Sequence, residues 1–256
     1  AMSQLPGLVP ADPSSHLVVN LSLMVDVPPK AQMLPQWFPN SAPNSAAMNT
    51  HEAEIDIFLQ LSHASLHEVV SWLSEHDVLV VAAAGNDGLS GGHPEERLPA
   101  RYDMDPSPPS VIGVAAVTNS STAAAYSNRG DSGVVVLGGD ATYSGLNEPP
   151  AVKETPQRDK DAVIGIYSSR VFPFADTPGD PARQNQTGWA FWSGTSFATP
   201  VISALAANRW LADPTASAVA IRNQILTQAT MAATALGANA IVATQLPDKV
   251  LGIGMP

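Results

Sequence analysis

Two mainly apolar runs, at residues 17–23 and 78–84, flank a stretch with helical periodicity at 52–75. A strand that is apolar at every position is typical of a parallel sheet whose two faces are both covered. Parallel neighbours need a long crossover connection, which is usually a helix. The order strand, helix, strand therefore predicts an α/β fold with a mostly parallel sheet between layers of helices.

The rest of the chain predicts three more strands and two more helices. We expect strands at 110–117, 134–137 and 163–167, and helices at 195–211 and 217–227. Proline, glycine and polar residues predict loops at 25–50, 138–161 and 171–188. No repeat or linker divides the 256 residues, so we expect a single domain over 1–256.

Composition excludes several classes of function. The net charge is −11 and the 12 lysines and arginines are scattered, which argues against a nucleic-acid partner. The chain has no cysteine, which excludes disulfides and thiolate metal sites. Its apolar runs are too short to span a membrane, and residues 1–15 lack the layout of a signal peptide. We therefore predict neither a nucleic-acid nor a membrane partner.

Ser196 is the candidate nucleophile. It lies in the string Ser-Gly-Thr-Ser-Phe-Ala-Thr-Pro at 193–200, which opens the helix predicted at 195–211. The free N–H groups and the dipole at a helix start favour negative charge and can stabilise the oxyanion of an acyl-transfer intermediate. The alternative interpretation is a helix cap. Pro200 comes early in this helix, where we expect its missing N–H to matter least.

Asn86 is the candidate oxyanion donor. The strand at 78–84 runs into Ala83-Ala84-Gly85-Asn86, and open α/β folds place their sites at the carboxyl ends of such strands. The small residues allow a substrate to approach the backbone closely. The alternative is that Asn86 is simply a turn residue before Gly88.

The segments 83–86 and 193–200 resemble the oxyanion and nucleophile segments of subtilisin-like serine proteases. Similar stretches occur at 20–23, 108–114 and 125–130, so that the resemblance covers roughly residues 17–212. It implies a three-layer subtilisin-like fold with Ser196 as nucleophile and Asn86 in the oxyanion hole. The substrate-binding positions that it implies are Ser22, Leu23, Met24, Ala83, Ala84, Gly85 and Thr195.

The chain also departs from the family pattern. Met24 stands where the family usually has Gly, residues 137–140 replace its Ala-Pro-Gly segment, and Val201 stands where it often has His. Nothing before residue 17 resembles the strands that carry the family's catalytic Asp and His. We therefore interpret the chain as an incomplete subtilisin-like domain, truncated at its amino-terminal side.

A general base must then come from elsewhere. His93, in a loop shortly after Asn86, is the better candidate, and His51 is expected in a loop on the same side of the sheet. His16 and His76 precede strands and belong to the opposite end. His63 and His67 share a helix face, which favours an exposed surface over a metal site because no third ligand is evident.

These observations predict a serine hydrolase that acts on esters more readily than on peptides, because activated esters need less acid catalysis of the leaving group. Two alternatives stay open: a fragment of a split or processed protease that needs another chain for Asp and His, and a non-catalytic binding protein.

We predict no cofactor. The resemblance implies calcium, but Asp103, Asp105, Asp131 and Asp140 lack the spacing of a calcium site. The strand at 17–23 is expected at a sheet edge, where it would pair with a second copy, a separate chain, or the ends of this one. The family is commonly secreted or periplasmic, although the sequence itself does not fix the compartment.

Overall fold

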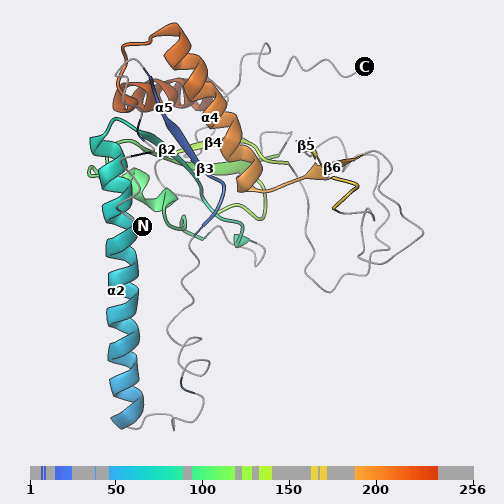
Figure 1. Cartoon of the computed structure of the whole chain (residues 1–256). Coiled ribbons are helices and arrows are strands. Elements are labelled where there is room, and N and C mark those ends of the chain that lie inside the picture. The colour runs from blue at the N-terminus through green and yellow to red at the C-terminus, as the bar shows by residue number, and fades with distance from the viewer. Residues whose placement is uncertain are drawn as a thin grey trace, which may run out of the picture.

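The computed structural model describes residues 7, 9, 15–24, 38, 46–88, 94–118, 123–128, 133–139, 163–166, 168–171 and 188–235. Within them a parallel sheet has the strand order β1-β2-β3-β4 (Figure 1). Its strands are β1 (Val18–Leu21), β2 (Leu79–Ala83), β3 (Val111–Val117) and β4 (Val134–Leu137). Val19 lies opposite Val80, and Val81 lies opposite Ile112.

Helices cover both faces of this sheet, as Figure 1 shows. Leu79 and Val81 of β2 pack in one apolar cluster with Ile202, whereas the alternating Val80 packs in another with Val70. This alternation explains why these strands carry apolar residues on both faces of the sheet. The helices concerned are α2 (Ala46–Glu75) on one face, and α4 (Thr195–Ala212) and α5 (Ala218–Ala235) on the other. The predicted three-layer α/β fold is confirmed.

A second, smaller sheet lies apart from the first. β5 (Val163–Ile166) pairs antiparallel with β6 (Trp189–Trp192). The strand predicted at 163–167 therefore exists, but it belongs to an antiparallel pair. β6 was not predicted.

The helix boundaries differ from the expected ones. α2 begins at Ala46, inside the stretch predicted as a loop, and α5 continues to Ala235, eight residues beyond the predicted end. A short 3₁₀ helix, η3 (Ala100–Met104), was also not predicted. The amino-terminal half of α2 extends beyond the sheet in Figure 1. No helix in the described part of the chain is long and apolar enough to cross a membrane.

Candidate active site

Ser196 lies in the first turn of α4, at the end of the sheet where the parallel strands finish. Its side chain is half-buried, and its Oγ donates a hydrogen bond to the carbonyl oxygen of Ser22 at 3.1 Å. In return, the Ser22 hydroxyl donates to the carbonyl oxygen of Ser196 at 2.9 Å. This reciprocal pair joins the segment after β1 to the start of α4.

The Ser22 contact also changes the interpretation of Pro200. Pro200 is the sixth residue of α4, beyond the first turn, so its missing N–H removes a bond that the helix would otherwise make to the Ser196 carbonyl. The Ser22 hydroxyl donates to that carbonyl instead. The expectation that the missing Pro200 N–H matters little because of its position in the helix was wrong. The Ser22 side chain supplies the hydrogen bond that the Ser196 carbonyl would otherwise lack.

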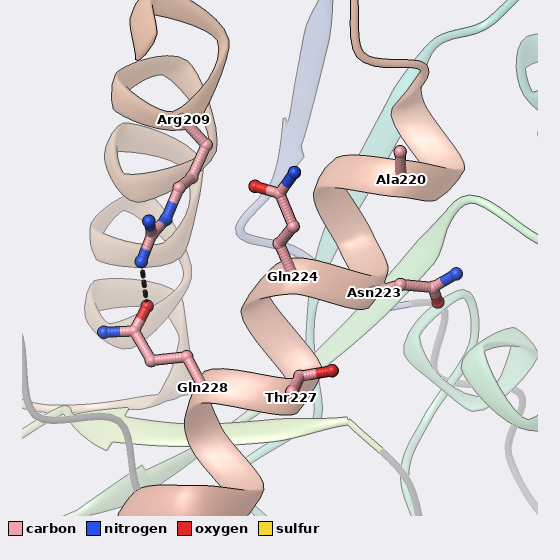
Figure 2. Close-up of a pocket in the computed structure, with 6 residues that line it drawn as sticks. All are labelled: Arg209, Ala220, Asn223, Gln224, Thr227 and Gln228. Atoms are coloured by element: carbon pink, nitrogen blue, oxygen red, sulfur yellow. Dashed lines mark hydrogen bonds between the residues drawn. The ribbon is translucent and has the colours of Figure 1, made fainter. Parts of the chain in front are cut away.

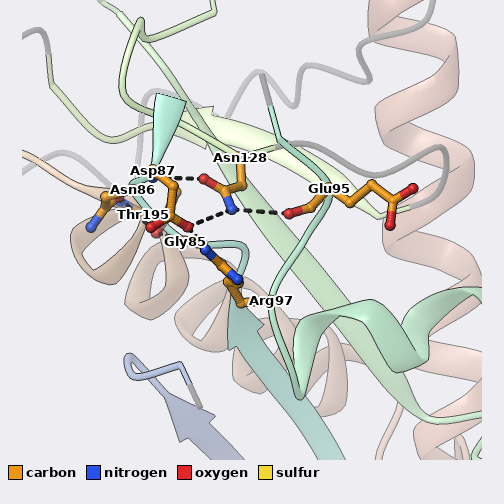
Figure 3. A network of polar contacts seen from close by, with 7 residues as sticks. All are labelled: Gly85, Asn86, Asp87, Glu95, Arg97, Asn128 and Thr195. Carbon is orange, nitrogen blue, oxygen red and sulfur yellow. Dashed lines mark hydrogen bonds and ion pairs between the residues drawn. The ribbon is translucent and has the colours of Figure 1, made fainter. Parts of the chain in front are cut away.

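Asn86 follows β2 closely and reaches the same helix start. Its Oδ1 accepts hydrogen bonds from the Thr195 N–H at 2.9 Å and from the Thr195 hydroxyl at 3.0 Å. Because both partners are donors, the Oδ1 must face Thr195 and the amide Nδ2 must point elsewhere. Figure 3 shows this nitrogen turned away from Thr195. Asn86 is exposed, so its amide is accessible.

The small residues before Asn86 allow the two segments to approach. Gly85 has φ +115°, and its N–H donates to the Thr195 hydroxyl at 3.2 Å. Ala83, Ala84 and Thr195 are buried. Ser22 and Met24 are half-buried, and Leu23 is 55% exposed. The structure thus brings the segments at 22–24, 83–86 and 195–196 together at the carboxyl ends of β1 and β2.

A polar network holds the turn that carries Asn86 (Figure 3). The Asn128 side chain accepts from the Asp87 N–H at 2.7 Å, and donates to the Asp87 carboxylate at 2.8 Å and to the Glu95 carbonyl at 2.9 Å. The Arg97 Nε also donates to the Asp87 carboxylate, at 2.8 Å. The hydrogen bond from Arg97 lowers the pKa of Asp87; burial opposes this shift and Asn128 adds to it.

Sequence reasoning gave no role to Asn128 or Arg97. Asn128 lies in the stretch at 125–130 that resembles the family, which was the available signal. Its contacts with Asp87 span 41 positions, so no local pattern indicates them.

The described histidines lie away from Ser196. His16 contacts the Pro214 carbonyl at 2.7 Å, and His76 contacts the Trp72 carbonyl at 2.8 Å. His67 contacts the Ser107 carbonyl at 2.9 Å and lies 3.4 Å from the Asp105 carboxylate. His51 was expected in a loop, but it lies in α2, paired with Glu54. His93 lies outside the described residues.

No metal centre is evident in the part of the chain that the structure describes, which contains no group of three or more His, Cys, Asp or Glu residues placed to hold an ion. Asp103 is buried, and its carboxylate accepts from the Gly113 N–H at 3.2 Å. Asp131 and Asp140 lie outside the described residues.

A shallow cavity lies between α4 and α5 (Figure 2). It is lined by Arg209, Ala220, Asn223, Gln224, Thr227 and Gln228. Arg209 is thirteen residues along α4 from Ser196, which corresponds to about 20 Å at 1.5 Å per residue. This cavity therefore lies away from the cluster of Ser196 and Asn86.

The model of the peptidase S8, or subtilase, family matches residues 44–254. No curated protein matches the chain. Similar solved structures include a protease from Pseudoalteromonas arctica PAMC 21717, which is 21% identical with a TM-score of 0.44, over 63% of this chain and 39% of that one.

Two further similar structures are sphericase and the prenylagaramide maturation protease PagA. Sphericase is 20% identical with a TM-score of 0.41, over 90% of this chain and 53% of its own. PagA is 18% identical with a TM-score of 0.41, over 83% of this chain and 51% of its own. The chain thus spans between 39% and 53% of the length of these three proteins.

Proposed function

Because the chain belongs to the subtilase family, whose fold is that of a hydrolase, we propose that it is a serine hydrolase with Ser196 as nucleophile and Asn86 as an oxyanion donor. The observation that carries this proposal is the pair of bonds between the Asn86 Oδ1 and Thr195, the residue before Ser196. They keep the Asn86 carboxamide and the Ser196 hydroxyl together at the start of α4. Both groups are at least partly accessible.

In the proposed reaction, the Ser196 Oγ attacks the acyl carbon of the substrate. The carbonyl oxygen gains negative charge, which the Asn86 Nδ2–H and the Ser196 backbone N–H stabilise by hydrogen bonds. A base accepts the hydroxyl proton, the leaving group departs with a proton, and water then hydrolyses the acyl-enzyme. His93 is our candidate base.

We further propose that esters are better substrates than peptides. In the described residues the Ser196 hydroxyl donates to a backbone carbonyl, and no histidine contacts it. Weak base and acid catalysis would slow amide hydrolysis most, because the amine leaving group needs a proton. A p-nitrophenolate leaving group does not need one. The same observation favours a second candidate: a chain that gains its base only when another polypeptide supplies it.

The test is hydrolysis of short p-nitrophenyl esters and of a peptide anilide. We expect Ser196→Ala to abolish ester turnover, and Asn86→Ala to lower kcat by roughly 10²–10³-fold, the loss measured for an oxyanion donor in a subtilisin. Ser203→Ala is the matched control, because Ser203 is also on α4 and its hydroxyl contacts Asn20 and Thr199 instead.

The outcomes separate the candidates. Turnover that depends on Ser196 and falls in His93→Ala supports the hydrolase with this base, and an unchanged rate in His93→Ala rules this histidine out. Activity that appears only after addition of a separate polypeptide supports the second candidate. Absence of any Ser196-dependent turnover, both without and with the added polypeptide, would refute the hydrolase and leave a binding protein.

A further inference from the structure

Residues 124–128 contact both halves of the proposed site, which are the turn that carries Asn86 and the start of α4 that carries Ser196. This segment is anchored on β3: the Ala124 N–H donates to the Ala116 carbonyl at 3.0 Å, and the Ser127 hydroxyl accepts from the Ala116 N–H at 2.9 Å. Tyr126 and Asn128 are 5% and 0% exposed. A buried segment bonded to a central strand is a rigid support.

Asn128 holds both neighbours of Asn86. Its backbone N–H donates to the Gly85 carbonyl at 3.0 Å, and its side-chain oxygen accepts from the Asp87 N–H at 2.7 Å. A side chain at position 85 would exclude this arrangement, because a Cβ there would lie 2.9 Å from the Asn128 Nδ2. With residues 85 and 87 both fixed, the backbone of Asn86 has little freedom to move.

Tyr126 contacts the second half of the site, at the start of α4. Its hydroxyl accepts from the Gly194 N–H at 3.0 Å and lies 2.8 Å and 2.7 Å from the carbonyl oxygens of Gly138 and Gly139. Gly194 precedes α4 with φ +139°, and it lies two positions before the proposed nucleophile Ser196. The Gly194 N–H also donates to the Gly138 carbonyl at 2.9 Å, so the hydroxyl joins Gly138 and Gly194 and helps to fix the backbone from which Ser196 projects.

We propose that 124–128 is the positioning segment of the site: Asn128 sets the placement of Asn86, and Tyr126 sets the placement of Ser196. This inference rests on the proposed function for its kinetic consequences, but not for its geometry. Because preorganised donors act only when correctly placed, loss of either contact should lower kcat and leave KM nearly unchanged.

The first test uses Tyr126→Phe, which removes a single oxygen atom, with Tyr102→Phe as matched control. The Tyr102 hydroxyl donates to the His63 carbonyl at 3.1 Å on α2, away from the site. We expect Tyr126→Phe to lower kcat for p-nitrophenyl esters about 10-fold to 100-fold with KM changed less than about two-fold, and Tyr102→Phe to change neither. Equal rates for the two variants would overturn the role of Tyr126.

The second test is a double-mutant cycle between Asn128→Ala and Asn86→Ala. If Asn128 acts through Asn86, its substitution should lower kcat in the wild type and change it less than about two-fold once Asn86 is absent. Tyr126→Phe should lower kcat in both backgrounds, because it acts on the other half. An equal loss from Asn128→Ala in both backgrounds would overturn the assignment of Asn128.

A readout without turnover separates this inference from the proposed function. In protein labelled with ¹⁵N-asparagine, the Asn86 side-chain amide signal, assigned by its loss in Asn86→Ala, should shift in Asn128→Ala and stay in place in Tyr102→Phe. An unmoved signal refutes the positioning role even if ester hydrolysis depends on Ser196. A moved signal without any Ser196-dependent hydrolysis supports it and refutes the hydrolase. If Asn128→Ala does not fold, Tyr126→Phe still decides the role of Tyr126.

Discussion

Asp87 is the charged residue next to Asn86, and its pKa is lowered from the ordinary value of 3.8 chiefly by the hydrogen bond from Arg97. A lowered pKa in the folded state means that folding favours the carboxylate. The resulting stabilisation is present above pH 3.8 and is lost as the pH falls through the folded-state pKa. The network in Figure 3 should therefore loosen only below pH 3.8, as the Asp87 carboxylate gains its proton.

We predict that Asp87→Asn is less stable than the wild type at pH 7, by about 1 kcal/mol at most because the ion pair is partly exposed and screened. The difference should shrink toward zero as the pH is lowered below 3.8. Thermal unfolding of both proteins from pH 7 to pH 2 measures it, with Glu75→Gln on the exposed end of α2 as control. A difference that stays constant down to pH 2 would contradict the assigned cause.

At the scale of elements, α4 depends on Ser22 for a hydrogen bond that Pro200 cannot make. We predict that Ser22→Ala costs about 1 kcal/mol of unfolding free energy, because it leaves the Ser196 carbonyl without its donor. In a Pro200→Ala background the restored N–H can bond that carbonyl, so the same substitution should cost less. Urea denaturation of the four proteins tests this coupling.

Ser203→Ala is the control for that cycle, since its hydroxyl contacts the Asn20 side chain and the Thr199 carbonyl and not the Ser196 carbonyl. Its cost should be the same in the wild type and in the Pro200→Ala background. If Ser22→Ala costs equally in both backgrounds, the side chain is not replacing the missing N–H.

The elements that sequence predicts best are those whose pattern is purely local. β2 and β3 are apolar at every position, and the carboxamide that follows β2 at Asn86 lies at the end of the sheet, where parallel strands place their sites. The start of α2 was missed because Ala46, Ala47 and Met48 follow a run of proline, serine and asparagine without a clear cap. Asn128 and Tyr126 were missed because their partners lie on distant segments.

At the scale of the whole molecule, β1 has a neighbour on one side only within the described residues. The Leu17 carbonyl accepts from the Leu79 N–H, so by the alternation of a strand the N–H groups of Val18 and Asn20 point away from β2. An edge of this kind recruits another strand. We propose that a second copy or a separate polypeptide pairs there, and that this chain is one subtilisin-like domain that the added strand extends.

For pairing with a second copy, we predict a mass above that of the monomer in light scattering, with slow hydrogen exchange at Val18 and Asn20. Asn20→Pro should prevent the pairing because proline has no N–H to donate, whereas Asn20→Ala, which removes only the side chain, should not. A monomer at every concentration, with rapid exchange at both amides, would show that the edge is left open in solution.

The site joins segments that are far apart along the chain: Ser22 and Ser196 are separated by 174 positions, Asn86 and Thr195 by 109, and Tyr126 and Gly194 by 68. Closing such long loops is entropically costly, and chains dominated by distant contacts fold slowly. Helical content should therefore return early in refolding, whereas the reactive hydroxyl reaches its final surroundings only when the last of these loops closes. Any activity that this chain has is thus a property of the fully folded molecule, and no short piece of it can be expected to retain it.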